Sequence, residues 1–478
     1  MSFTSPIFYA FVFLTVLAFH VSANLSYRKT VLSIANLVLI ASFTTAWLQL
    51  APLAVFLVLG FVVVTLVSHN RTALAMAVGL LIILSAYIFL KQFFFLQAYS
   101  LPFAYTVVGL SYVLFRIVHL IVDVSSGEIE SIPGPLEFFR YTCNFLCFVS
   151  GPIQTWQEFR TDEASLAAAL NSELVFKAFS RVITGLLKVA VIAAAANYLY
   201  ENVSVQILLP DQTGRSIGFY AKYAFSAASY TAYLYYNFSG YMDIVIGVGA
   251  LLGQRIPENF DRPFSARSFL EFWQRWHMTL SLWFKAYVFT PLMLILVRLF
   301  PSPAATAYLG VLCFFVTFLL MGIWHGSTAV FVIYGLLMGL GASVNKLWQV
   351  GMNAFLGKKK YRALQDQWAY SELCRGLTFG YFAMALTCLW VSSLGQFGLL
   401  ADRLGVTGVV LALLTLTLGF ACSFRPFQFA QERLDAITLR LRLKSTPAQN
   451  ILIASRILLV LFFMGLLDKT PEFVYKAF

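Results

Sequence analysis

The amino-acid sequence predicts an all-α protein that crosses a membrane many times. Hydrophobic residues make up 60% of the 478 residues and charged residues only 11%, whereas a soluble domain carries about 25% charged residues. The apolar stretches run without interruption for about 20 residues, the length of a membrane helix, and they lack the alternation of a membrane β-barrel. This composition excludes an ordinary soluble enzyme, because too little polar surface remains to face water, and it excludes a disordered chain.

Apolar stretches follow one another along the whole chain, and we expect about 11 to 13 transmembrane or re-entrant helices. The candidates lie at 6–22, 31–48, 51–68, 73–91, 104–122, 175–200, 217–252, 286–300, 305–345, 376–395, 405–423 and 450–467. We assign residues 1–100 to N-terminal transmembrane helices and residues 101–478 to the core. The first stretch is expected to be a retained helix, because no basic residue precedes it and no small-residue cleavage site follows it.

The basic residues indicate orientation rather than nucleic-acid binding. The net charge is +12, and in a membrane protein such a surplus marks cytoplasmic loops and contact with anionic lipids. The pair Arg28-Lys29 and the run Lys358–Lys360 are therefore expected inside, with the N-terminus outside. Membrane lipids are expected partners, and nucleic acid is not.

The six cysteines do not indicate a metal site. Cys143 and Cys147 are spaced to share one face of a helix, but no histidine pair lies near them at ligand spacing. We interpret all six as small hydrophobic residues in apolar helices. No metal is predicted.

Residues 254–285 break the hydrophobic pattern, because charged and aromatic side chains are interleaved along them. A spanning helix could not hold so many charges, and a water-facing loop does not need so many aromatic rings. Two interpretations remain, an amphipathic helix at the membrane interface and a re-entrant segment that enters protein-lined depth.

The local signals in this segment predict one helix. Two prolines exclude a regular helix over 256–263, and Ser265 or Ser268 can cap the helix that follows. Its apolar face would carry Phe269, Phe272, Trp273 and Trp276.

His325 is the second anomaly, because no other ionisable side chain occurs in 305–345. An ionisable residue in a membrane segment costs several kcal/mol unless it is paired or faces a wet cavity, so His325 is a functional candidate by default. The alternative is a histidine satisfied within the core. Gly322 and Gly326 flank it and would allow a helix or a ligand to approach closely.

Two smaller polar clusters lie in earlier apolar stretches. Asn237 and Asp243 either hydrogen-bond between helices or line a polar cavity. Arg116, His119 and Asp123 fall on one helical face and can pair with one another.

The order of the motifs resembles the bacterial branch of the membrane-bound O-acyltransferase (MBOAT) family, which contains alginate, cellulose and peptidoglycan O-acetyltransferases and the D-alanyl-transfer membrane protein of teichoic acids. The matching strings are Asn237–Asp243, Pro257–Phe260, Pro263-Phe264, Phe272–Ser281 and Trp324-His325-Gly326, with Gly109–Tyr112 and Phe473–Tyr475 as lesser matches. The chain departs from the branch at Lys285-Ala286-Tyr287, where Arg-Asp-Tyr is common, and in its last four residues.

The resemblance implies a ring of helices around a central funnel or tunnel. It implies two functional histidines, with His325 as the invariant one and His277 as the second. The acyl donor would be a cytoplasmic thioester, either acetyl-coenzyme A or an acyl-carrier protein, with no tightly bound cofactor. The acceptor would be a hydroxyl of an exopolysaccharide or cell-wall glycan outside a bacterial inner membrane, and a periplasmic acetyltransferase is a further possible partner.

The chemistry is consistent with this expectation. A neutral, buried imidazole can take the proton of a sugar hydroxyl, and such base assistance is worth roughly 10²–10⁴-fold. His277 would either orient His325 or the acceptor, or help to bind the donor. Further donor-binding or tunnel-lining candidates are Trp324, Asn237, Asp243, Arg275, Trp276, Trp273 and Lys285.

Three other functions remain open, one of which is acyl transfer to a lipid or a protein. The enzyme could transfer D-alanyl groups to teichoic acid, or the protein could carry acyl groups or glycan across the membrane without catalysis. The basic residues Arg255, Arg262, Arg267, Arg275 and Lys285 either contact lipid or recognise phosphates of the donor.

Overall fold

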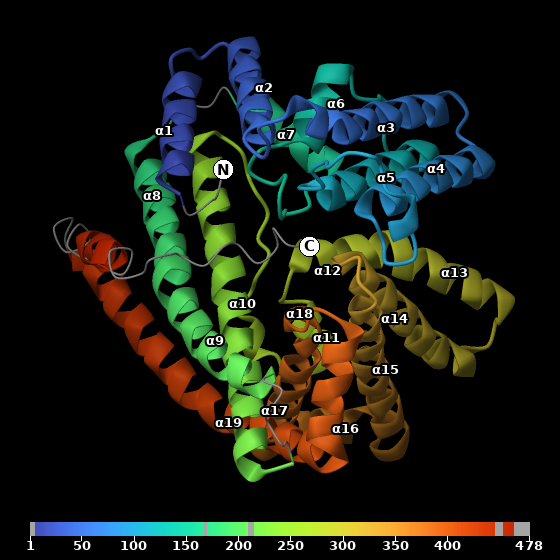
Figure 1. Cartoon of the computed structure of the whole chain (residues 1–478), viewed down its shortest axis with the longest axis vertical. Helices are drawn as coiled ribbons and strands as arrows, with labels where there is room; N and C mark the ends of the chain where they lie inside the picture. The colour runs from blue at the N-terminus through green and yellow to red at the C-terminus, as the bar shows by residue number, and fades with distance from the viewer. Residues whose placement is uncertain (1–4, 167–169, 209–214, 445–452, 463–478) are drawn as a thin grey trace. The chain divides into compact units, whose positions relative to one another are not determined.

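The computed structural model describes residues 5–166, 170–208, 215–444 and 453–462, and these residues form helices joined by turns (Figure 1). The prediction of an all-α polytopic membrane protein is confirmed. Among the described residues, eight helices are long and apolar enough to cross a membrane. They are Trp47–His69, Ala73–Lys91, Ser172–Leu208, Met278–Leu299, Ala305–His325, Val330–Leu356, Trp368–Trp390 and Leu394–Pro426.

The chain divides into two compact units, and each is described by itself. The first, here called unit 1, comprises Met1–Leu186 and Gly240–Glu258. The second, unit 2, comprises Leu187–Ser239 and Asn259–Pro471. The border expected between residues 100 and 101 stays a prediction, and the C-terminal string Phe473–Tyr475 lies outside the described residues.

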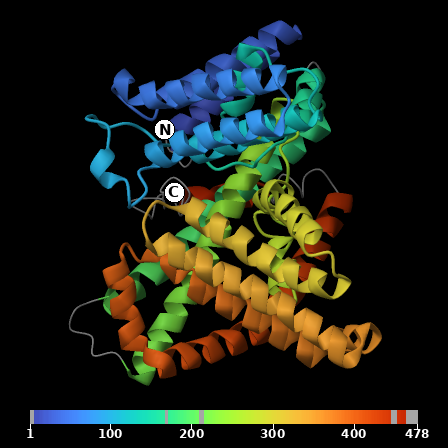
Figure 2. The same ribbon diagram turned by 90° about the vertical axis from the view of Figure 1, so that its right-hand side faces the viewer.

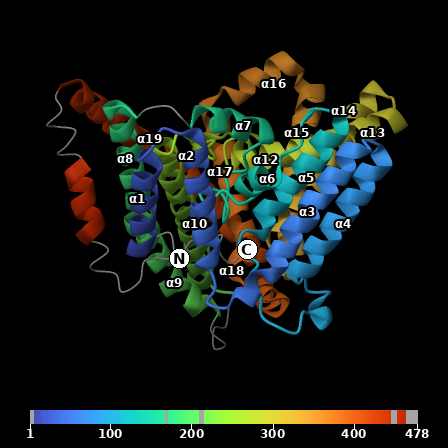
Figure 3. The ribbon, with the colours of Figure 1, turned by 90° about the horizontal axis from the view of Figure 1, so that it is seen from above.

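Unit 1 holds the N-terminal helices. They are α1 (Pro6–His20), α2 (Leu25–Ala41), α3 (Ala51–His69), α4 (Ala73–Lys91), α5 (Leu110–Ser126), α6 (Pro135–Thr142), α7 (Trp156–Ser165) and α8 (Ser172–Leu187). Polar side chains cap several of them, because the first N–H groups of a helix lack partners within it. Ser5, Asn24 and Thr72 accept hydrogen bonds from the N–H groups in the first turns of α1, α2 and α4. The helices α3, α4 and α5 pack side by side (Figure 3).

The apolar stretch 217–252 forms a single long helix, α10 (Ile217–Leu251), although a stretch of this length could hold two helices. Its residues up to Ser239 belong to unit 2, and those from Gly240 belong to unit 1.

Unit 2 holds the remaining helices. They are α9 (Ala194–Leu208), α11 (Phe269–Trp273), α12 (Met278–Phe284), α13 (Thr290–Leu299), α14 (Pro303–His325), α15 (Val330–Leu356), α16 (Lys358–Gln365), α17 (Trp368–Ala385), α18 (Thr387–Trp390) and α19 (Leu394–Lys444). The stretches Lys188–Ala193 and Lys285–Phe289 are π-helical. The positive φ of 57° at Gly405 kinks α19, a conformation that glycine adopts without steric cost.

The predicted apolar stretch 305–345 resolves into α14 and α15, which pack along each other (Figure 2). Glycines allow this close approach, as the sequence indicated. A Cβ on Gly322 would lie 2.1 Å from the Cα of Gly335, and a Cβ on Gly326 would lie 2.1 Å from the ring of Phe331. The end of α14, which carries His325, is therefore tightly held against the start of α15.

One local prediction was wrong. Cys143 and Cys147 do not share a helix, because α6 ends at Thr142 and both cysteines lie in the turns that follow it. Both side chains are nonetheless buried, as expected for small hydrophobic residues.

We predict that Gly322→Leu disrupts the packing of α14 on α15, because the added side chain overlaps the backbone of Gly335. The purified variant should elute from a size-exclusion column as aggregate and unfold at lower temperature. Gly419→Ala in α19 is the control, since a Cβ there meets nothing within 4 Å. Equal elution and melting of both variants would contradict the close contact.

Candidate active site

The segment 254–285 begins as extended chain and becomes helical only after its second proline. Residues 254–262 form no regular helix and Pro263–Ser265 form one 3-10 turn, so both prolines act as expected. Ser268 then caps α11 by accepting a hydrogen bond from the N–H of Glu271, which confirms one of the two predicted caps.

The four aromatic side chains of the predicted apolar face are buried within unit 2. Phe269, Phe272, Trp273 and Trp276 are all buried. The ring centre of Trp273 lies 5.0 Å from that of Phe318 in α14, and the ring centre of Phe272 lies 4.6 Å from that of Phe382 in α17. This burial favours a segment lined by protein over an amphipathic helix with its aromatic face in lipid.

The predicted helix is shorter than its aromatic spacing indicated. The helix α11 ends at Trp273, so Trp276 lies beyond it. Trp276 instead forms an isolated antiparallel bridge with Phe260, and the N–H of Asp261 donates to the carbonyl of Arg275 at 3.0 Å. The segment therefore folds back on itself just before His277.

His277 has a strained backbone. Its φ of 46° and ψ of 51° place it in the left-handed region, where a non-glycine residue costs about 1–3 kcal/mol. Its side chain is only 1% exposed, and its ring centre lies 4.8 Å from that of Phe238 in α10. Strain at a buried ionisable residue is typical of functional sites.

His325 is the last residue of α14 and is 4% exposed. Its ring lies between two aromatic side chains, with ring centres 4.9 Å from Trp324 and 5.6 Å from Tyr334. Both histidines lie in unit 2 and are close enough for their charges to interact. Burial lowers the pKa of His277 well below 6.5, and the charge of His325 lowers it further. The imidazole of His277 is therefore neutral at ordinary pH and able to accept a proton.

Three basic side chains of the segment, those of Arg262, Arg267 and Arg275, are paired with carboxylates. Arg275 lies 3.2 Å from both Asp261 and Glu271, and Arg267 lies 3.6 Å from Asp366. Lys285 is exposed at the start of a π-helical stretch. A role for Arg275 in binding donor phosphates would therefore have to compete with an ion pair already formed in the protein.

The two polar residues predicted in α10 lie in different units. Asn237 is fully buried in unit 2. Asp243 lies in unit 1, where its carboxylate accepts a hydrogen bond at 3.1 Å from Arg181 of α8. Arg181 also donates two hydrogen bonds, of 2.7 and 2.6 Å, to the carboxylate of Glu258. These ion pairs give Asp243 a structural explanation, while its role as a lining residue stays a prediction.

Sequence reasoning missed Arg181, although a signal was present. It lies within the apolar stretch 175–200, and an arginine in such a stretch requires a carboxylate partner. The lone aspartate in the next long apolar stretch was the natural candidate.

The cluster in α5 pairs largely as predicted. The Nε2 of His119 accepts a hydrogen bond at 2.9 Å from the N–H of Trp156, so the proton of the neutral ring lies on Nδ1, 3.2 Å from the carboxylate of Asp123. Arg116 does not join this pair but donates to the backbone carbonyls of Tyr141 and Thr142.

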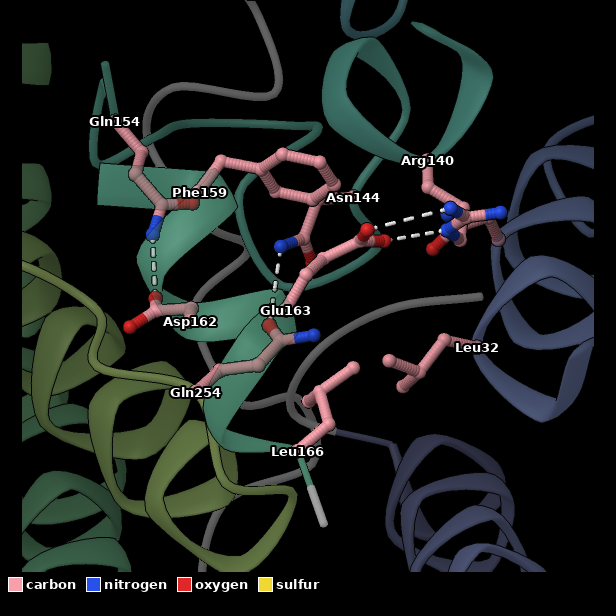
Figure 4. A pocket seen from close by; sticks show the side chains of 10 residues that line it. Leu32, Arg140, Asn144, Gln154, Phe159, Asp162, Glu163, Leu166 and Gln254 are labelled. Carbon is pink, nitrogen blue, oxygen red and sulfur yellow. Dashed lines mark hydrogen bonds and ion pairs between the residues drawn. The ribbon is translucent and has the colours of Figure 1, made fainter. Parts of the chain in front are cut away.

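A polar pocket in unit 1 holds the chain at the start of the segment (Figure 4). Asp162 accepts hydrogen bonds from Gln154 at 2.6 Å and from the N–H of Arg255 at 3.0 Å, and Asn144 donates to Gln254 at 3.0 Å. Burial raises the pKa of Asp162, and the two hydrogen bonds oppose that shift. The pocket is lined by Leu32, Asn36, Arg140, Asn144, Gln154, Phe159, Asp162, Glu163, Leu166 and Gln254.

The fold and the site together define a polytopic α-helical membrane protein with two buried histidines in one unit. Residues 96–382 match the membrane-bound O-acyltransferase family. The chain therefore belongs to that family, as its motifs indicated.

Similar curated proteins carry two kinds of name. The chain is 31% identical to a "Teichoic acid D-alanyltransferase" of Streptococcus thermophilus, over 50% of this chain and 57% of that protein. It is 32% identical to a protein of the same name from Bacillus subtilis, over 48% and 56%. It is 27% identical to a "Probable alginate O-acetylase AlgI" of Pseudomonas fluorescens, over 54% and 48%. The matches thus span about half the length of each of these relatives.

We predict that Arg181→Met lowers stability by about 1–2 kcal/mol, because it leaves the carboxylates of Asp243 and Glu258 without their shared partner. The low end of this range is expected since Arg181 is 32% exposed. Thermal unfolding in detergent is the measurement. Lys177→Met, which breaks an exposed pair with Glu173, is the control and should change stability less than Arg181→Met does.

We also predict that His277 makes stability depend on pH. Because its pKa is lowered in the folded protein, the unfolded chain binds a proton below pH 6.5 that the folded protein does not bind, so stability falls as the pH drops. The slope from this one group reaches at most about 1.4 kcal/mol per pH unit. Unfolding measured from pH 7 to pH 5 should be less pH-dependent in His277→Gln than in the wild type. Equal slopes would show that His277 titrates normally, and His69→Gln, at an exposed histidine, controls for the substitution.

Proposed function

We propose that this protein transfers an acyl group, in the first instance acetyl, from a cytoplasmic thioester donor to a hydroxyl of an extracytoplasmic polysaccharide. The observation that carries the proposal is the presence of two buried histidines, His277 and His325, in one unit of a protein from a family of O-acyltransferases. The names of the relatives agree with acyl transfer, since one describes D-alanyl transfer and the other O-acetylation.

In the proposed reaction His325 is the general base. Its imidazole takes the proton as the acceptor hydroxyl attacks the thioester carbonyl carbon. A new C–O bond forms, the C–S bond breaks, and the proton passes from His325 to the departing thiolate. The buried site keeps water away from the thioester, which limits hydrolysis. His277, strained and buried beside Phe238, either orients His325 and the acceptor or contacts the donor.

We favour direct transfer over an acyl-enzyme. The sequence contains no Gly-x-Ser-x-Gly elbow, and a thioester is already activated toward a hydroxyl. Donors of two kinds fit the proposal, acetyl-coenzyme A and an acyl-carrier protein. We place the protein in a bacterial inner membrane, where a periplasmic acetyltransferase could complete the modification.

The experiments below also test two other functions. D-alanyl transfer to teichoic acid is favoured by the first two relatives and differs in the donor. A transporter that only carries acyl groups or glycan would not need a base at His325.

We predict that His325→Ala abolishes donor consumption by the purified protein, with a loss of about 10²-fold or more. Acetyl-coenzyme A and D-alanyl-charged carrier are supplied separately, and the released thiol is measured. The donor that the wild type consumes decides between acetyl and D-alanyl transfer. Matched His69→Ala, at an exposed histidine far along the chain, should retain full activity.

The same variant separates the alternatives. Retained transport of acyl groups into vesicles by His325→Ala would favour the transporter. Loss of folding, seen as a loss of monodisperse protein, would instead identify His325 as a core histidine. A radiolabelled acyl group that stays attached to a histidine would contradict direct transfer.

A further inference from the structure

The helix α12 begins in an unusual way. The first N–H groups of a helix lack partners within the helix, and the side chain of the capping residue commonly accepts one of them. Here the capping position is His277, whose side chain makes no such hydrogen bond. Its left-handed backbone, with φ of 46°, is also not the extended conformation that a capping side chain requires.

Asn259 supplies the missing cap from a distance in the chain. Its backbone carbonyl accepts a hydrogen bond from the N–H of Met278 at 3.0 Å. Its side-chain Oδ1 accepts from the N–H of Thr279 at 3.0 Å and from the Thr279 hydroxyl at 2.7 Å. Asn259 is fully buried, so these hydrogen bonds are shielded from competition with water.

The peptide on the other side of His277 is held as well. Phe260 bridges to Trp276, and the N–H of Asp261 donates to the carbonyl of Arg275. Three consecutive residues, 259–261, therefore make backbone or side-chain hydrogen bonds to the chain both before and after His277. The ring of His277 does not serve as the cap, and it packs instead against Phe238.

We infer that Asn259 is a positioning residue for His277, because it replaces the cap that His277 would otherwise have to provide and so holds His277 in its left-handed conformation. The loss of activity expected on substitution of Asn259 rests on the proposed function. The expected change in the orientation and shielding of the His277 imidazole does not.

The test compares two substitutions at one position in the full-length protein. Asn259→Asp keeps acceptor oxygens at the same place, whereas Asn259→Leu keeps the size and removes the acceptor. With the donor that the wild type consumes, Asn259→Leu should lose about 10²-fold in kcat/KM, as expected when a group at the reacting centre is displaced. The loss falls on kcat if His277 orients His325, and on KM if His277 contacts the donor. Asn259→Asp should retain kcat/KM close to that of the wild type.

A second readout requires no substrate. The rate at which diethyl pyrocarbonate modifies His277 is followed by mass spectrometry of peptides, with the exposed His69 as internal standard. In Asn259→Leu the ratio of the two rates should rise about tenfold as the start of α12 opens, and in Asn259→Asp it should stay unchanged. Thr279→Val, which removes only the hydroxyl and keeps the N–H bond, should remain within about 3-fold in both readouts.

The outcomes are decisive in each case. An unchanged His277 reactivity in Asn259→Leu, or equal losses in the Leu and Asp variants, overturns the inference. If Asn259→Leu does not insert into the membrane, Asn259→Ala takes its place. If both of these variants fail to fold while Asn259→Asp folds, Asn259 is a general structural residue and the inference is overturned. If the wild type transfers no acyl group, the proposed function fails while the reactivity of His277 still tests the positioning.

Discussion

The hydrogen bonds between residues 259–261 and residues 275–279 hold His277 in a backbone conformation that it would not adopt alone. Such a conformation costs about 1–3 kcal/mol at a non-glycine residue, and the surrounding structure must offset that cost. The buried aromatic rings of the segment do so by packing against α14 and α17. The helix α14, on which Trp273 packs through Phe318, is also the helix that ends at His325.

Several charged residues in the described part of the chain pair with one another. Arg181 joins two carboxylates in unit 1, and Arg275 joins two in unit 2. An unpaired charge inside an apolar protein would cost several kcal/mol. This cost explains both why the chain carries few charged residues and why these ones are paired. A buried histidine differs from these residues, because its neutral imidazole carries no charge that needs compensation.

The sequence was sufficient to predict the fold class and a helix cap at Ser265 or Ser268, because hydropathy and capping chemistry are local. The catalytic roles of His277 and His325 stay predictions. It was not sufficient to predict that Trp276 leaves the helix and pairs with Phe260. That pairing depends on contacts between residues 16 positions apart, and helical spacing alone favoured a longer helix. The partner of Asp243 and the cap from Asn259 were missed for the same reason, since each joins segments that no local pattern relates.

The central claim is that His325 is the base of acyl transfer and that His277 supports it by orienting its imidazole. A double-mutant cycle on donor consumption measures this coupling directly. The account predicts that the double variant His277→Ala/His325→Ala loses about as much activity as the more damaging single variant, because groups that act together do not contribute independently. If the two losses multiply instead, the histidines act separately, and that result would contradict the account.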